Sequence, residues 1–389
     1  MTGTFSLGEE HNDFRAAVAD FAARDLAPQV ERWNAANEAS LEAIKLMGNF
    51  GLFGLGGPEE YGGAGDFTSL CIAIEEIGKV DQSLGITLEA AVGLGINPIA
   101  HFGTTEQKQR WLPELLAGHA LAAFGLTEAE SGSDAGATRT RAERRDGHWV
   151  INGSKQFITN SGTDITALCT VTARTGTRAN GKPEISTLVV PTGTPGFVVG
   201  PAYAKLGWHA SDTHPLTFTD VVVPEDHLLG VEGQGYGQFL SILDDGRVAI
   251  AALALGCIRA CLELSVAYAG ERTSFGSPIG RKQGVAFPIA DLDVMAAAAH
   301  QLVYAAAAMR DHGAEPQAFN RAAAIAKLYA TESAVTATRI ATQVFGGYGF
   351  MEEYPIARFY RDAKVLEIGE GTSEVQRLLI ARGLGLPVE

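Results

Sequence analysis

Cysteine is scarce in this sequence, with four residues among 389, and no two of them form a CxxC pair. Cys257 and Cys261 lie four positions apart in an apolar stretch of helical character, where we expect small core residues. The scarcity excludes a disulfide scaffold. It favours a reducing compartment, which is the cytoplasm, or the mitochondrial matrix if this is a processed eukaryotic form.

Long apolar runs are also missing. The longest, residues 248–258, ends at Arg259, and a membrane-spanning helix needs about 20 apolar residues. The N-terminus, MTGTFSLGEEHNDF, has neither an apolar signal core nor the Arg-rich composition of an organelle presequence. We therefore expect no membrane insertion.

Positive charge is in the minority, with 30 Lys and Arg against 45 Asp and Glu and a net charge of −15. This balance argues against non-specific nucleic-acid binding, and an anionic ligand would need local arginines. Hydrophobic residues make up 46% and charged residues 19%, as in globular enzymes. The length predicts about two or three domains.

Several well-known motifs are absent: the P-loop, HExxH and the GxSxG elbow. His209 and His214 have no cysteine nearby, and we interpret them as loop histidines rather than metal ligands. Gly233, Gly235 and Gly237 lack the strand–turn–helix context of a dinucleotide fingerprint, so we expect a loop before a helix.

The chain reads as helix, then strand, then helix. We place a helical N-terminal domain at residues 1–120, a middle β domain at 121–230 and a C-terminal helical bundle at 231–389. In the first part, Ser40 is expected to cap a helix, and Thr104 with Gln107 to form a capping box. Further helices are expected over residues 68–77 and 84–100.

The middle and last parts differ in period. Asp146-Gly147 and Asn152-Gly153 have the composition of hairpin turns. Strands are expected over residues 165–173, 185–190 and 216–223. Long Ala-rich helices, suited to burial against one another and against other subunits, are expected over residues 236–269, 283–312 and 317–344.

Four stretches could carry chemistry. FGLTEAESGSDAG (124–136) offers glycines and the hydroxyls of Thr127, Ser131 and Ser133 to a ligand, although an ordinary turn is the alternative. NGSKQFITN (152–160) is by itself merely a hairpin. ERTSFGSPIGRKQ (271–283) carries cations suited to binding a pyrophosphate. A solvated charged loop is the alternative.

The fourth stretch, residues 343–382, contains a Gly-rich break and then Glu370 between two glycines. Flanking glycines leave a carboxylate reachable and let the backbone approach a ligand. Thr372 or Ser373 is expected to cap the following helix. A surface glutamate in a loop is the alternative from this segment alone.

Together, LTE…GSD, FITN, ERTSFG…Q, QVFGGYG and GEGTSEVQR resemble the acyl-CoA dehydrogenase family in order and spacing, from about residue 8 to residue 386. LDDGRVAIAALALG (243–256) is a further match, and the short- and branched-chain members are most similar. The resemblance implies a mainly α fold: a helical N-terminal domain, a middle β-barrel-like domain and a C-terminal four-helix bundle. It also implies a homotetramer with one FAD per subunit.

The resemblance implies the following roles. The flavin ring would lie against Phe124, Gly125, Leu126, Thr127, Ser133, Phe157, Ile158 and Thr159. A neighbouring subunit would hold the rest of the FAD with Arg272, Phe275, Gln283, Gln343, Val344, Phe345, Gly346 and Gly347. Thr372, Ser373 and Glu374 would contact FAD within the subunit's own site. The acyl-CoA would contact Ser133, Asp244, Asp245, Gly246, Arg247 and Gly371.

Glu370 would be the catalytic base, because some members place the base one residue before Arg247, where this chain has Gly246. The implied reaction is α,β-dehydrogenation of a short, medium or short branched acyl-CoA to the trans-2-enoyl-CoA. Hydride would pass to flavin N5 and electrons to electron-transfer flavoprotein. Fatty acid β-oxidation and branched-chain amino acid degradation are the matching pathways.

Three positions bear on substrate and acceptor. Phe157 replaces the family's usual tryptophan, which weakens the case for electron-transfer flavoprotein. Gly369 replaces a tyrosine of straight-chain members, which leaves room for a branched chain. The expected pocket floor, residues 84–95, holds Glu89 and no arginine, which argues against dicarboxylyl substrates.

Rival interpretations are an acyl-CoA oxidase or a flavin monooxygenase on the same fold, and a non-catalytic acyl-CoA- or flavin-binding protein. The length argues against the larger oxidases, and Glu370 argues against the other two.

Overall fold

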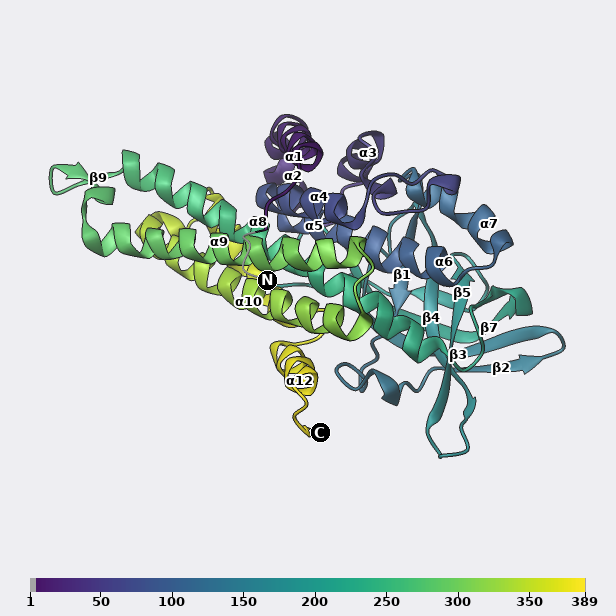
Figure 1. Cartoon of the computed structure of the whole chain (residues 1–389). Helices are drawn as coiled ribbons and strands as arrows, with labels where there is room; N and C mark the ends of the chain where they lie inside the picture. The colour runs from purple at the N-terminus through teal and green to yellow at the C-terminus, as the bar shows by residue number, and fades with distance from the viewer. Residues whose placement is uncertain (1–4, 389) are drawn as a thin grey trace.

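The computed structural model describes residues 5–388. Helical, β and helical parts follow one another along the chain, as the sequence predicts. In Figure 1 the sheet lies at one end of the molecule, and the long helices α8, α9 and α10 extend away from it to a hairpin that carries β9. Sheet and hairpin therefore mark opposite ends.

The first part is built from short helices. These are α1 (Glu9–Phe21), α2 (Val30–Ala36), α3 (Leu41–Asn49), α4 (Phe67–Val80), α5 (Gln82–Glu89), α6 (Asn97–Phe102) and α7 (Thr105–Leu116). Ser40 caps α3, and Thr104 with Gln107 forms the expected capping box of α7. The helix expected over residues 84–100 is interrupted by a π-helical segment, Ala90–Ile96, that directly follows Glu89.

The middle part is a sheet. Its strands are β1 (Leu121–Gly125), β2 (Arg141–Arg145), β3 (His148–Thr159), β4 (Thr166–Thr177), β5 (Pro183–Pro191), β6 (Phe197–Val199), β7 (Thr213–Pro224) and β8 (Leu228–Leu229). The strand order is β6-β7-β3-β2-β4-β5-β8, and β1 pairs in parallel with β4. The end of β1 is thereby fixed close to β3 and β4.

The two expected hairpin turns had different outcomes. Asp146 and Gly147 both have positive φ and join β2 to β3, as expected. The turn expected at Asn152-Gly153 is wrong, because both residues lie inside β3 at an irregularity in its pairing with β7. There the side chain of Asn152 exchanges two hydrogen bonds with Asp220, which satisfies the bulged strand.

The last part consists of long helices and their connections. Its elements are α8 (Gly235–Glu271), β9 (Thr273–Ser274), β10 (Ser277–Pro278), α9 (Gln283–Asp311), α10 (Pro316–Phe345), α11 (Pro355–Ala363) and α12 (Ser373–Gly383). The three long helices match the expected ranges to within a few residues. α8, α9 and α10 pack against one another, and α12 packs on α10.

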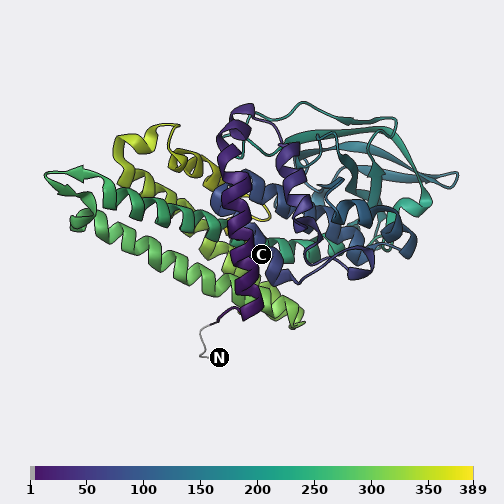
Figure 2. The same ribbon diagram turned by 90° about the horizontal axis from the view of Figure 1, so that it is seen from above.

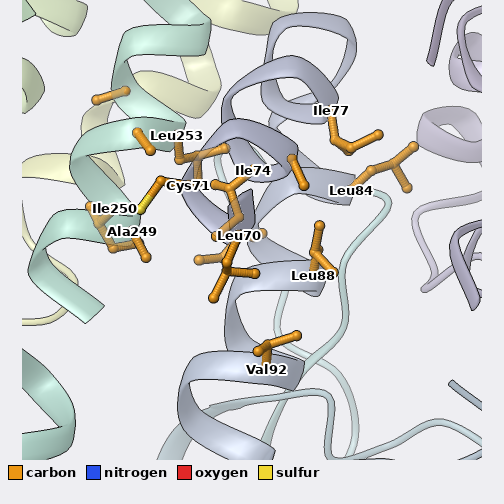
Figure 3. Packing of buried hydrophobic residues seen from close by; sticks show 14 of the residues in the cluster. Leu70, Cys71, Ile74, Ile77, Leu84, Leu88, Val92, Ala249, Ile250 and Leu253 are labelled. Atoms are coloured by element: carbon orange, nitrogen blue, oxygen red, sulfur yellow. The ribbon is translucent and has the colours of Figure 1, made fainter. Parts of the chain in front are cut away.

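The core joins the first and last parts. In Figure 3, Leu70 and Ile74 of α4 face Ala249 and Leu253 of α8, and Leu88 of α5 lies beside them. These apolar faces bury α4, α5 and α8 against each other, which fixes α5 relative to α8.

Three helical segments are long and apolar enough to cross a membrane by length and composition: Gln82–Phe102, Gly235–Glu271 and Gln283–Asp311. Their apolar windows are 89%, 78% and 39% buried inside the chain. Internal packing therefore accounts for the apolar sequence of the first two, while the third keeps an exposed apolar face.

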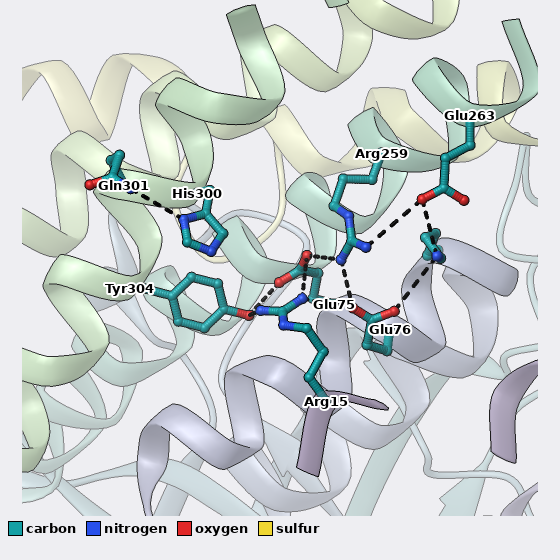
Figure 4. A network of polar contacts seen from close by, with 9 residues as sticks. Arg15, Glu75, Glu76, Arg259, Glu263, His300, Gln301 and Tyr304 are labelled. Atoms are coloured by element: carbon teal, nitrogen blue, oxygen red, sulfur yellow. Dashed lines mark hydrogen bonds and ion pairs between the residues drawn. The ribbon is translucent and has the colours of Figure 1, made fainter. Parts of the chain in front are cut away.

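A buried ion network ties α1 to the long helices (Figure 4). Glu75 of α4 binds Arg15 of α1 at 2.9 Å and also contacts Arg259 of α8. Tyr304 of α9 donates a hydrogen bond to the same carboxylate. Burial raises the pKa of Glu75, but the two guanidinium groups outweigh it and hold the pKa below the usual value.

In Figure 2, α1 crosses the molecule between the hairpin end and the sheet.

Candidate functional site

Glu370 lies in the loop between a short 3-10 turn, Lys364–Glu367, and α12. Its φ is 53°, in the left-handed region that is uncommon for a residue with a side chain. The next carbonyl, that of Gly371, accepts hydrogen bonds from Lys327 Nζ at 2.7 Å and Gln376 Nε2 at 2.9 Å. Thr372 then caps α12. Donors from two helices therefore hold the backbone on which Glu370 sits.

The side chain of Glu370 turns toward α8 and occupies space left by Gly246. A Cβ on Gly246 would overlap Oε2 of Glu370. On the other side, the carboxyl of Glu89 at the end of α5 lies within hydrogen-bonding reach. The carboxyl is thus enclosed by a bare helix backbone and a second carboxyl.

The electrostatics of this pair are unusual. Burial raises the pKa of Glu370; the contact with Glu89 and the charges of Lys327 and Arg247 oppose this shift without cancelling it. Burial and the neighbouring Glu370 both raise the pKa of Glu89 well above its usual value. Burial also lowers the pKa of Lys327 to about 8. Such shifts are common at functional sites.

The neighbouring residues of α8 are already paired. Arg247 is buried and forms an ion pair with Asp244, which also accepts from Asn320 Nδ2 at 2.6 Å. Asp245 binds Arg310 Nε at 2.7 Å. These contacts fix the helix face that carries Gly246.

The loop that follows β1 lies next to α8 and β3. Phe124 stacks on Phe239 of α8 with ring centroids 3.9 Å apart. The amide of Gln156 donates to the carbonyl of Thr127 at 2.8 Å. Ser133 is exposed. The loop from Phe124 to Ser133 therefore borders both the sheet and the helix that faces Glu370.

A buried ion pair that was not predicted from the sequence organises this loop. Lys155 Nζ binds Glu128 at 2.7 Å and donates to the carbonyl of Leu126 at 3.1 Å. Glu128 also accepts from the amides of Arg139 and Thr140. Burial raises the pKa of Glu128, but Lys155 and these donors lower it to about 2.

The end of β3 presents an aromatic ring. Phe157 has a φ of 61°, and its side chain is 64% exposed beside Tyr203. Ile158 points instead into the sheet core, and Thr159 is partly buried. Asn160 donates to the carbonyl of Thr87 at 3.0 Å, which links β3 to α5, the helix of Glu89.

The expected cofactor residues Thr372, Ser373 and Glu374 lie at the start of α12, next to Glu370. The others form a second group, the hairpin group, at the far end of the long helices (Figure 1). Arg272 lies over the ring of Tyr348 at 5.3 Å, and Phe345 stacks on Tyr268 at 4.1 Å. Phe275 is 96% exposed on the hairpin tip. The hairpin group comprises Arg272, Phe275, Gln283, Gln343, Val344, Phe345, Gly346 and Gly347.

One chain does not bring the hairpin group to the residues near the sheet, because the long helices separate them. Glu370, Gly246 and the α8 residues 244–247 come together, and α5 and α8 connect them to the loop after β1. Two partners of this site went unrecognised in the sequence, Glu89 as a neighbour of Glu370 and Lys327. Each is a charged residue inside an apolar helical stretch, which is a signal of a buried, paired charge.

Residues 5–388 contain no group of three or more His, Cys, Asp or Glu side chains placed to hold a metal ion. His209 and His214 bind backbone carbonyls of Lys205 and Gly200.

Three family models match the chain: acyl-CoA dehydrogenase, N-terminal domain (residues 8–119), middle domain (123–221) and C-terminal domain (233–385). Among curated relatives, the probable acyl-CoA dehydrogenase YngJ of Bacillus subtilis is 46% identical over 98% of this chain and 99% of its own. The short-chain specific acyl-CoA dehydrogenase of Megasphaera elsdenii is 40% identical over 98% and 99%. An acryloyl-CoA reductase (NADH) of Anaerotignum propionicum is 39% identical over 97% and 95%.

Solved structures agree. Butyryl-CoA dehydrogenase from Megasphaera elsdenii superposes with a TM-score of 0.93 at 40% identity, covering 98% of this chain and 100% of its own. A chain from a study of the electron transferring flavoprotein of Acidaminococcus fermentans gives 0.93 at 40%, covering 98% and 99%. A glutaryl-CoA dehydrogenase from Mycobacterium smegmatis in complex with FADH2 gives 0.90 at 31%, covering 97% and 95%. The chain therefore belongs to the acyl-CoA dehydrogenase family, whose members are flavoprotein oxidoreductases of fatty acid oxidation.

Proposed function

We propose that this chain is an FAD-dependent dehydrogenase that converts a short straight or branched acyl-CoA into the trans-2-enoyl-CoA, with Glu370 as the base for the α-proton. The observation that carries the proposal is the carboxyl of Glu370, held on a left-handed backbone and seated against the bare backbone of Gly246.

The residues present fit a flavin dinucleotide. Near the sheet, the exposed ring of Phe157 and the hydroxyls of Thr127 and Ser133 offer an aromatic face and donors. In the hairpin group, Arg272 has no carboxylate within ion-pairing distance among residues 5–388, so its charge is free for a phosphate. Since the two groups are far apart, we propose that one FAD contacts both through a neighbouring subunit of a homotetramer.

Bound FAD would accept the β-hydrogen as a hydride at N5. The chain's own part is the proton. A thioester α-proton is far less acidic than a glutamic acid, whose ordinary pKa is about 4.3. Burial raises the pKa of Glu370 and makes it a stronger base. The amide of Glu370 is available to stabilise the thioester oxygen, and one such donor contributes about 3–4 kcal/mol in oxyanion sites.

A short acyl chain is supported by the butyryl-CoA and short-chain relatives. Gly369 supports tolerance of a branch, because a side chain there would meet little besides the carbonyl of Val365 at 3.6 Å. Glu89 is fully buried and contacts Glu370. The case against dicarboxylyl substrates rests on the lack of arginine in residues 84–95.

Electron-transfer flavoprotein is the proposed acceptor, supported by the similarity to the chain from the electron transferring flavoprotein study. Phe157 keeps an exposed aromatic ring at the edge of the site. Because one relative is named an acryloyl-CoA reductase (NADH), the direction of the reaction, dehydrogenation or reduction, is part of the test.

The test is anaerobic titration of the purified yellow protein with butyryl-, isobutyryl-, 2-methylbutyryl-, isovaleryl- and octanoyl-CoA, following flavin bleaching. We expect the short and branched substrates to bleach the flavin, and reoxidation by electron-transfer flavoprotein to be faster than by oxygen. Preference for octanoyl-CoA would overturn the chain-length proposal. Rapid peroxide formation under air would favour an oxidase. Oxidation of NADH by crotonyl- or acryloyl-CoA would favour a reductase.

Glu370→Gln should keep bound FAD and substrate affinity and lose almost all flavin reduction, because the amide cannot take the α-proton. Stopped-flow reduction and substrate-induced spectral shifts measure the two properties separately. A variant that reduces its flavin at the wild-type rate would show that the base lies elsewhere.

A further inference from the structure

Glu89 is a buried carboxyl with no ordinary partner. Its side chain is fully inaccessible, and neither of its oxygens receives a hydrogen bond from any donor within residues 5–388. Oε2 of Glu370 is buried and without a donor in the same way. Leaving such buried groups unsatisfied destabilises the folded chain, and more so when they are charged. A proton shared between the two carboxyls removes most of this deficit.

The fold makes room for the pair from two helices. A Cβ on Gly93, one turn beyond Glu89, would lie 2.7 Å from Oε1 of Glu89. A Cβ on Gly246 would overlap Oε2 of Glu370. Each carboxyl therefore fills space left by the missing side chain of a glycine, Gly93 one turn along the same helical segment and Gly246 on α8. The π-helical segment that begins at Ala90 adds a further irregularity, and such segments are frequent at functional sites.

The charged groups around the pair show which carboxyl keeps the proton. Arg247 of α8 and Lys327 of α10 both favour the ionised form of Glu370. Lys327 is itself influenced by Glu367 of the preceding turn, and Arg247 is paired with Asp244. No cation contributes to the pKa of Glu89, which burial and the charge of Glu370 raise. The proton therefore belongs on Glu89.

We propose that Glu89 is a positioning residue for the base: it stays protonated and donates a hydrogen bond to the carboxylate of Glu370. This inference rests on the proposed role of Glu370. The hydrogen bond does two things. It orients the carboxylate, and it keeps Glu370 ionised near neutral pH although burial favours the protonated form. Glu89 acts through Glu370 and does not itself take the α-proton.

Two variants separate the hydrogen bond from mere packing. Glu89→Gln keeps the shape and an N–H donor but cannot lose a proton. Glu89→Leu keeps the volume and removes the donor. The acid limb of the rate of flavin reduction reports the ionisation of Glu370. We expect this limb to stay within about half a pH unit in Glu89→Gln and to rise by about one to two units in Glu89→Leu. KM should change little in either.

A second measurement does not depend on turnover. The infrared C=O band of a protonated carboxylic acid in the resting protein at pH 8 should disappear in Glu89→Gln. Asp362, whose pKa burial raises to about 7, is another source of such a band. Asp362→Asn is therefore the matched control and should leave the Glu89 band in place.

Identical acid limbs in wild type and both variants would refute the proposal, as would a carboxylic acid band unchanged by Glu89→Gln. Equal shifts in the Gln and Leu variants would also refute it, since the amide must rescue a hydrogen bond. If Glu89→Leu does not fold, the Gln variant and the infrared band still decide. A Glu370→Gln enzyme with normal turnover would overturn the proposed base instead, while the infrared band would still show where the resting proton lies.

Discussion

Gly246 is important because its missing side chain leaves the space that Oε2 of Glu370 occupies. In Gly246→Ala the methyl group would force the flexible carboxyl away from its seat. Helix stability should not suffer, because alanine favours a helix interior by about 0.5–1 kcal/mol over glycine. We expect turnover to fall by about a hundredfold, because displacing a catalytic group by about 1 Å can slow a reaction by that factor. The melting temperature should be unchanged or higher.

The same helix supplies the control. Gly237 also lies in α8, and nothing lies within 4 Å of a Cβ added there. Gly237→Ala should therefore keep wild-type turnover. Full activity in Gly246→Ala, or equal losses in both variants, would mean that the contact between the carboxyl of Glu370 and Gly246 is not needed for turnover.

The role of Glu370 was predicted from the sequence, but its surroundings were not. Two flanking glycines pointed to an accessible, functional carboxylate, and the family resemblance pointed to its role. Neither revealed Glu89 as its neighbour, because a contact between residues 281 positions apart depends on how α5 and the loop before α12 both pack beside α8. Such packing follows from the whole core and has no local signature.

At the scale of elements, the Lys155–Glu128 pair predicts a large stability effect. Lys155→Met leaves Glu128 buried without its cation, and breaking such a pair costs about 3–5 kcal/mol. The double variant Lys155→Met/Glu128→Gln removes the stranded charge and should recover part of the loss. Urea unfolding of the holoenzyme measures both, and flavin retention should fall with Lys155→Met because Leu126 loses a donor.

The same pair predicts a dependence on acid. The pKa of Glu128 in the folded chain is about 2, below its unfolded value, so the unfolded chain binds the proton first. Its contribution is complete above the unfolded pKa and is lost as pH falls toward 2. The unfolding free energy of wild type should therefore drop more steeply below about pH 4.5 than that of the double variant. Parallel pH curves would contradict this.

Helices and strands were predicted well where the apolar pattern extends over many residues. They were predicted poorly where the identity of one or two residues determines a turn or a bulge. The three long helices follow from Ala-rich amphipathic stretches with few breakers. Asn152-Gly153 misled because the dipeptide suits a tight turn and a bulged strand alike, and only pairing with β7 selects the bulge. The π-helical break after Glu89 contains Gly93 and Gly95 and precedes Pro98, but such residues do not distinguish a π-helical segment from an ordinary helix end or kink.

At the scale of the whole molecule, the separation of the two cofactor groups becomes a prediction about assembly. If FAD spans two subunits, a functional site takes Glu370 from one chain and Arg272 from its neighbour. Homomers of Arg272→Glu and of Glu370→Gln should each be inactive. A co-expressed hybrid would contain sites with both native residues, about a quarter of all sites by random pairing of two chains.

Differently tagged chains allow the hybrid to be purified by two affinity steps, and each homomer is the control. Flavin reduction by butyryl-CoA in the hybrid would show that the hairpin group serves a neighbour's site. An inactive hybrid would show that both residues act within one chain. The long helices would then have to bend enough to bring the hairpin back to the sheet, which their mutual packing along α8, α9 and α10 opposes.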